Sequence, residues 1–293
     1  MQESNKSKMS LIASMFIFGT IGIFRKYIPL PSSVLAMARG LVGMLFLLAI
    51  IRVKKTPMDR EAIKRNLILL ILSGAVLGFN WILLFEAYRY TTVATATLCY
   101  YMAPILVILV SPFLLKERLT KRKLACVAVA LVGMYFVSGM METGFSGAAE
   151  FKGIFLGLGA AVFYACVMLF NKFIKGIGAF DKTIMQLGAS TVVLIPYILL
   201  TEDLAAIAFD GLAVAMIFVV GIVHTGIAYA LYFGSMDGLR AQTIALFSYI
   251  DPVVAILLSA LVLKEAISMW GVIGAVLVLG ATLISELPER KKV

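Results

Sequence analysis

Asp251 is the residue whose type and position point most directly to chemistry. It lies about ten residues into an apolar stretch that runs from 241 to 263. At 1.5 Å per residue this is roughly 15 Å deep, the middle of a bilayer if the stretch spans one. A carboxylate there costs about 2.5–3.5 kcal/mol on insertion scales, and such residues usually serve a function. The alternative is a protonated or hydroxyl-bonded carboxyl that only fastens helices.

Three further ionisable residues lie within apolar stretches, one of them close to the end of its stretch. His224, the only histidine, falls at a similar depth within 211–235. It could pair with Asp251, accept and release a proton, or only form a hydrogen bond to a neighbouring helix. Arg39 and Glu86 both lie toward the same side of their stretches. We therefore predict an ion pair between them, which would be a gate, a structural contact or both.

Aromatic and amide side chains cluster at comparable heights. Rings beside one carboxylate suit a cation or a zwitterion, through cation–π and charge contacts. The alternative is that they are ordinary core or interface residues. Together with Asp251 and His224, the predicted substrate-binding residues are Phe18, Asn80, Trp81, Tyr100, Tyr101, Tyr164, Tyr229 and Tyr249.

The composition requires a membrane around these residues. Of the 293 residues, 62% are hydrophobic and only 14% are charged, and the mean hydropathy is +1.02. Soluble domains carry about a quarter charged residues. A water-soluble chain could not hide this much apolar surface, so we expect a multi-pass protein of the inner, cytoplasmic membrane with lipid as its solvent.

Charge and cysteine content argue against several other classes of protein. The net charge is +10, but the basic residues form short clusters between apolar stretches, which indicates membrane topology and not nucleic-acid binding. The three cysteines have no metal-ligand spacing, and one histidine cannot supply a multi-histidine site. The sequence has neither a phosphate-binding loop nor a nucleophile elbow. We therefore expect no metal, no cofactor and no ATP-driven pump, and we do not expect an enzyme.

Ten stretches are long enough, or nearly so, to cross a bilayer as helices, which takes about 20 residues. They are 9–27, 33–51, 66–87, 91–115, 124–140, 153–173, 181–201, 211–235, 241–263 and 266–285. Of the 26 Lys and Arg residues, twenty fall on one side of these spans, five fall on the other, and Arg39 lies within a span. The positive-inside rule then predicts that both termini are cytoplasmic.

The sequence contains an internal repeat. Ala103–Pro104 aligns with Asp251–Pro252 at a shift of 148 residues, and the same shift places Lys116–Glu117 on Lys264–Glu265. Proline removes a backbone hydrogen bond from a helix, so we predict equivalent helix kinks at Pro104 and Pro252.

The repeat divides the chain into two units, residues 1–145 and 146–293, with five predicted spans each. Because five is odd, the second unit crosses the membrane in the opposite sense to the first. Inverted repeats of this kind are typical of secondary transporters, whose substrate site lies near the midplane between the repeats. The expected fold is an all-α membrane protein of ten transmembrane helices in two inverted five-helix repeats.

The two proline-containing segments resemble a known family. Residues 90–120 read YTTVATATLCYYMAPILVILVSPFLLKERLT, and residues 239–268 read LRAQTIALFSYIDPVVAILLSALVLKEAIS. Both resemble the EamA-type families of the drug/metabolite transporter superfamily, and the resemblance covers essentially the whole chain. It implies a carrier that works by alternating access and commonly exports amino acids, amines or other metabolites. The small four-helix relatives carry a carboxylate in their first helix, but Phe16 to Phe24 contains none, so their coupling mechanism cannot be transferred.

These inferences give one leading hypothesis. The chain is a secondary-active or facilitative carrier that exports a small amino-acid-like or amine-like metabolite through a cavity at the midplane. A membrane scaffold or a channel is the alternative, and an intramembrane enzyme is less favoured. Protons are a candidate coupling ion, the lipid bilayer and a small-molecule substrate are the expected partners, and a monomer is expected.

Overall fold

The computed structural model describes residues 2–114, 116, 119–137, 147–207, 209–236 and 247–287, and this part of the chain is helical with no strand. The first half contains α1 (Gln2–Tyr27), α2 (Ser32–Val53), α3 (Arg60–Tyr90), α4 (Val93–Tyr100), α5 (Ala103–Leu114) and α6 (Lys121–Val137). The second half contains α8 (Ala148–Phe173), α9 (Ala179–Thr201), the 3-10 helix η1 (Leu204–Ala206), α10 (Gly211–Phe218), the π-helix η2 (Val219–Ile227), α11 (Ala228–Met236), α13 (Ile250–Leu261) and α14 (Met269–Glu286). The predicted division between residues 145 and 146 lies outside the described residues.

Seven helical segments are long and apolar enough to cross a membrane. They are Asn5–Tyr27, Ser32–Val53, Arg60–Tyr90, Val93–Leu114, Ala149–Phe173, Ala179–Thr201 and Gly211–Tyr232. Two shorter apolar helices, Ile250–Leu261 and Met269–Ser285, follow them in the chain. The prediction of an all-helical membrane protein is confirmed for the residues that the structure describes.

Polar side chains cap the first turn of several helices. We predicted a span at 66–87, but α3 begins at Arg60 because the side chain of Asp59 accepts a hydrogen bond from the backbone nitrogen of Ala62. Such a cap satisfies a donor that the first helical turn leaves free. The side chains of Thr92, Asp210 and Ser268 cap α4, α10 and α14 in the same way.

Two predicted spans are interrupted near their centres. The chain turns at Tyr101, between α4 and α5, shortly before Pro104. In the second half it turns at Tyr249, and α13 then begins with Pro252 in its first turn. A first helical turn tolerates proline because the missing N–H would have no partner there. The two prolines therefore start helices after a break, at matching positions of the repeat.

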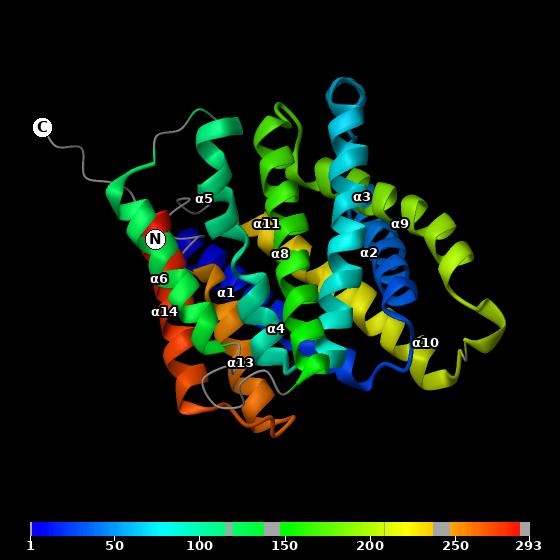
Figure 1. The fold of residues 1–293 in the computed structure, drawn as a ribbon. Coiled ribbons are helices and arrows are strands. Elements are labelled where there is room, and N and C mark those ends of the chain that lie inside the picture. The colour runs from blue at the N-terminus through cyan, green and yellow to red at the C-terminus, as the bar shows by residue number, and fades with distance from the viewer. Residues whose placement is uncertain are drawn as a thin grey trace, which may run out of the picture.

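The two halves of the chain are interlocked. Helix α1 packs mainly against α11 and α13 of the second half, and α8 packs against α3, α4 and α5 of the first. Helix α2 lies against α9, and α6 lies against α14 (Figure 1). The connections 54–59 and 174–178 lie at one end of the molecule, while 28–31 and 262–268 lie at the other (Figure 1).

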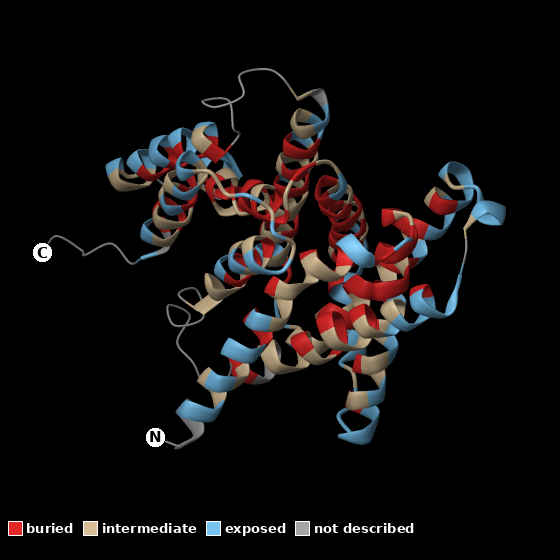
Figure 2. Ribbon diagram, turned by 90° about the horizontal axis from the view of Figure 1, so that it is seen from below, coloured by how far each residue is buried: buried red, intermediate tan, exposed pale blue. Residues whose placement is uncertain are grey.

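The outer faces of the helices are apolar. Figure 2 shows buried residues gathered in the interior and exposed residues on the outward faces. Large hydrophobic side chains are among the most exposed, including Leu200 at 86% and Phe113 at 84%. A water-soluble monomer rarely exposes apolar surface on this scale, and a bilayer would cover it.

Glycines allow the closest helix contacts inside the chain. Gly74 and Gly78 of α3 face α9. In α8, Gly153 faces Thr91, just before α4, and Gly157 faces Cys99 of α4. A Cβ atom on Gly74 would lie 2.4 Å from the carbonyl oxygen of Gln186, a distance that side chains essentially never adopt. The glycine pairs thus serve packing within one chain, as small residues do between membrane helices.

We expect Gly74→Ala to destabilise the fold by about 1–3 kcal/mol, because the added methyl group must push α3 away from α9. Gly280→Ala is the matched control, since a Cβ atom on Gly280 would have no neighbour within 4 Å. Thermal unfolding of the purified protein measures the difference. Equal melting temperatures for the two variants would show that the helices do not meet at Gly74.

Candidate functional site

A cavity of about 520 Å³ lies between the two halves of the chain. Its walls come from α1, α2, α3, α4 and α5 of the first half, and from α8, α11 and residues 248–255 of the second half. Ligand pockets commonly enclose about 300–1,000 Å³. The cavity therefore has room for a small organic molecule.

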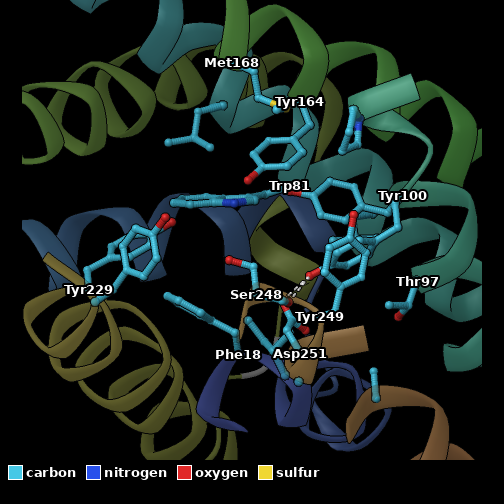
Figure 3. Close-up of a pocket in the computed structure, with 18 of the residues that line it drawn as sticks. Phe18, Trp81, Thr97, Tyr100, Tyr164, Met168, Tyr229, Ser248, Tyr249 and Asp251 are labelled. Atoms are coloured by element: carbon cyan, nitrogen blue, oxygen red, sulfur yellow. Dashed lines mark hydrogen bonds between the residues drawn. The ribbon is translucent and has the colours of Figure 1, made fainter. Parts of the chain in front are cut away.

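Aromatic side chains form much of the cavity wall. The rings of Phe18 and Tyr229 lie 5.3 Å apart, and Tyr100 stacks on Tyr164 at 4.8 Å between centroids. Figure 3 shows Trp81 and Tyr164 on one side of the cavity and Phe18 on the other, with Tyr229 and Tyr100 at opposite ends. Such a wall offers both apolar contact and π faces to a ligand.

Asp251 is the only carboxylate among the described residues of the cavity wall. Its Oδ2 accepts a hydrogen bond of 2.9 Å from the Tyr101 hydroxyl, drawn as a dashed line in Figure 3. Helix α1 comes close at this point, because a Cβ atom on Gly19 would lie 2.6 Å from the Asp251 carbonyl oxygen. No basic side chain of the described residues forms an ion pair with Asp251, so none of them neutralises this carboxyl group.

Arg39 places a positive charge in the same cavity wall. Its side chain is deeply buried, and the residue is only 5% exposed. Nε donates a hydrogen bond of 3.0 Å to Thr225 Oγ1, and Cζ lies 4.2 Å from the centroid of the Trp81 ring. The guanidinium is thus held over an aromatic face, where a cation–π contact stabilises it.

The predicted ion pair between Arg39 and Glu86 is absent from the structure. Glu86 instead accepts a hydrogen bond of 2.6 Å from Ser32 and pairs with Arg89 at 3.0 Å. Trp81, which contacts Arg39, precedes Glu86 by five residues, or a rotation of about 140° around α3. Ser32 precedes Arg39 by seven residues on α2, so Glu86 differs from the contact point of Arg39 both in depth and in helix face.

Two predicted binding residues lie outside the cavity wall. His224 is 1% exposed, and its Nε2 lies 2.9 Å from Thr20 Oγ1 rather than against Asp251. Asn80 is fully buried, and its side-chain nitrogen donates a 2.6 Å hydrogen bond to the Ala160 carbonyl. Both side chains join helices, His224 linking η2 to α1 and Asn80 linking α3 to α8.

The other predicted binding residues all lie in the cavity wall. They are Phe18, Trp81, Tyr100, Tyr101, Tyr164, Tyr229, Tyr249 and Asp251. The wall also contains Pro104, whereas Pro252 is buried and does not line the cavity.

Sequence reasoning did not select Tyr88, Thr97 and Met168, which also line the cavity. Helical spacing could have found two of them. Tyr88 follows Trp81 by seven residues, and Thr97 precedes Tyr101 by four, so each shares a face with a selected residue.

The π-helix η2 positions the partner of Arg39. The Thr225 hydroxyl donates to the carbonyl oxygen of Val220, five residues earlier, at 3.2 Å, and accepts the bond from Arg39. A π-helical turn alters the register of the side chains that follow it, and such turns are frequent at functional sites. The hydrophobic pattern of 211–235 carries no signal of this change.

An ion pair joins the two halves at one end of the bundle. Lys26 Nζ lies 3.0 Å from Glu265 Oε1. The other oxygen of Glu265 accepts hydrogen bonds from the backbone nitrogen of Val93 at 2.8 Å and from Ser259 Oγ at 2.5 Å. Glu265 thereby ties together the end of α1, the start of α4 and the end of α13.

Lys264, which precedes Glu265, has a positive φ angle, and so does Lys116 at the equivalent position of the repeat. Lys264 has a φ of 54°, and Lys116, which precedes it by 148 residues, has a φ of 55°. Positive φ is uncommon for residues other than glycine. The repeat seen in the sequence thus extends to local backbone geometry.

Residues 6–139 and 151–286 both match the EamA-like transporter family. The chain belongs to this family. It is 29% identical over 294 aligned positions to the uncharacterized transporter YxxF of Bacillus subtilis, covering 99% of this chain and 93% of the relative. It is 27% identical to the uncharacterized transporter YoaV of the same species, covering 85% and 84%, and 25% identical to an uncharacterized transporter of Archaeoglobus fulgidus, covering 94% of each chain.

A solved crystal structure of a protein 20% identical to this EamA-like chain has a TM-score of 0.67 and covers 96% of this chain and 97% of its own. The shared fold agrees with the family match. The chain is therefore a multi-pass membrane protein of the cell membrane, and it is a transporter of the drug/metabolite type rather than an enzyme.

Proposed function

We propose that this EamA-like transporter carries a small amino-acid-like or amine-like metabolite out of the cell by alternating access. The observation that supports this proposal is the central cavity, which residues of both halves line and which holds Asp251 among aromatic rings. In transporters built from inverted repeats, the substrate binds between the repeats and the halves move around it.

The proposed topology has ten membrane spans and cytoplasmic termini. Helices α6, α13 and α14 complete the ten when added to the seven longer spans. The reciprocal packing of α1 on α11 and α13, and of α8 on α3 and α4, supports two repeats related by inversion. The connection 54–59, which contains Lys54 and Lys55, would face the cytoplasm with the other basic connections.

The proposed conformation is open toward the cytoplasm and closed on the outside. Lys26 and Glu265 hold the halves together at the end assigned to the outside. A second cavity of about 200 Å³ shares Pro104 and Met168 with the central cavity and extends to Lys172, near the opposite end of α8. The two cavities together suggest the route by which a cytoplasmic substrate enters.

Asp251 has two candidate roles within this cycle. It either contacts a cationic group of the substrate or takes up a coupling proton, and a carboxyl at this depth suits both roles. We propose that the transporter acts as a monomer, because the close glycine contacts are made within one chain.

Counterflow into proteoliposomes tests the carrier function. Amino acids and amines that raise the thermal stability of the purified protein are chosen first, since a ligand of the folded state stabilises it. A carrier loaded with one such solute should accumulate the labelled solute transiently, in exchange for the unlabelled one. A channel would only equilibrate it, and a scaffold would behave as protein-free vesicles do; either result refutes the proposed function.

A further inference from the structure

The guanidinium of Arg39 has no anionic partner within the described part of the chain. Thr225 receives its only hydrogen bond, through Nε, and Trp81 and Phe85 provide only ring contacts, at 4.2 and 5.6 Å. The ionisable groups that interact with it electrostatically are the phenols of Tyr88, Tyr100 and Tyr229 and the imidazole of His224, and none of them is a carboxylate. The two terminal nitrogens, with four N–H donors, therefore have no hydrogen-bond acceptor among the described residues.

A buried arginine without an anionic partner lowers the stability of a protein unless a bound ligand supplies that partner. Burying an unpaired charge is strongly unfavourable, and buried charges in proteins are normally paired. Asp251 lines the same cavity, yet no ion pair joins it to Arg39. The cavity wall thus presents one positive and one negative group that do not neutralise each other.

We propose that Arg39 binds the carboxylate of the transported molecule, while Asp251 faces its ammonium group. The inference rests on the proposed function and deepens it, because it selects zwitterionic amino acids over simple amines. A guanidinium presents its donors as a planar fork that matches a carboxylate with two parallel hydrogen bonds. The contact with the Trp81 ring at 4.2 Å and the bond from Nε to Thr225 hold that fork in place.

The same charges disfavour other anions. A phosphate group carries a larger negative charge, and Asp251 would repel it within the same cavity. The described wall residues include no second arginine or lysine to offset that repulsion. Aromatic rings make up much of the remaining wall, which suits an apolar side chain on the bound amino acid.

The first experiment uses the unaltered protein and varies the ligand. Each of the twenty protein amino acids is compared in binding with its decarboxylated amine, and the amino acid that binds tightest is also compared with its carboxamide. We expect the amino acid to bind at least tenfold more tightly than the amine and the carboxamide, a difference of ~1.4 kcal/mol. An amine that binds as tightly as its amino acid would overturn the inference.

The second experiment varies Arg39. Arg39→Gln should weaken binding of the amino acid at least tenfold, yet leave binding of the matching amine within about twofold, because the amine never used the guanidinium. Arg39→Lys keeps the charge but loses the fork, so its affinity should fall between those of Arg39→Gln and the unaltered protein. Arg52→Gln is the matched control, an exposed arginine on the same helix.

The outcomes separate the inference from the proposed function. If amines drive counterflow and amino acids do not, the carrier function stands and the role of Arg39 is wrong. If no solute drives counterflow, the proposed function fails. If Arg39→Gln weakens amine and amino acid equally, Arg39 only supports the cavity through Thr225 and Trp81, and the inference is again wrong.

Discussion

Asp251→Asn is expected to weaken substrate binding at least tenfold, or ~1.4 kcal/mol, while the protein still folds. The substitution keeps the shape of the side chain and can keep the hydrogen bond with the Tyr101 hydroxyl. What it removes is the negative charge, which no basic residue of the described chain neutralises. A substrate ammonium in the cavity would therefore lose its only carboxylate partner. Affinity measured at several pH values tests this, because the effect should be present wherever Asp251 is ionised.

A proton-binding role for Asp251 predicts a different pattern. Binding would then persist in Asp251→Asn, and the pH dependence of transport would flatten. Tyr101→Phe provides a graded comparison, since it removes the bond to the carboxylate but not the charge. Asp203→Asn is the distant control, because Asp203 caps the short helix η1 outside the cavity. Unchanged affinity together with an unchanged pH profile in Asp251→Asn would leave the carboxyl group no role beyond joining helices.

The sequence predicted the general location of the site because depth in a membrane helix can be counted. Asp251, Tyr101 and Phe18 lie at similar heights in three different spans, and all three line one cavity. The internal repeat strengthened this prediction, since it aligns the two proline breaks beside which Tyr101 and Tyr249 lie. Position along the membrane normal is thus readable from an apolar pattern.

The direction in which a side chain points was harder to predict. A helix that is apolar on every face has little amphipathic signal to say which face meets the core. We therefore predicted an ion pair between Glu86 and Arg39 from their positions along the spans. In the structure Arg39 contacts the face of α3 that carries Trp81. The π-helix adds a second difficulty, since it turns His224 toward Thr20 and Thr225 toward Arg39. These errors mainly concern rotation about the helix axis, and for Glu86 they also include depth, since its partner Ser32 lies seven residues before Arg39 on α2.

Glu265→Gln is expected to open the end of the transporter that we assign to the outside. The Glu265 carboxylate forms an ion pair with Lys26 and accepts hydrogen bonds from the backbone nitrogen of Val93 and the Ser259 hydroxyl. Hydrogen bonds to a charged group contribute about 1.5–3 kcal/mol each. Neutralising the carboxylate weakens all three contacts, and only the contacts with Lys26 and Val93 join the two halves. The population open to the outside should therefore rise at least tenfold, which corresponds to ~1.4 kcal/mol.

A cysteine at Thr97, which lines the cavity from the middle of α4, would report this change. In a background without the three native cysteines, a membrane-impermeant thiol reagent applied from outside should label it at least tenfold faster in Glu265→Gln. Lys26→Met should have a smaller effect, because Glu265 then keeps its bonds to Val93 and Ser259. The double variant should label no faster than Glu265→Gln alone, since residues that act through one ion pair are not additive. Labelling that is unchanged or slower in Glu265→Gln would show that this ion pair does not hold the outer side closed.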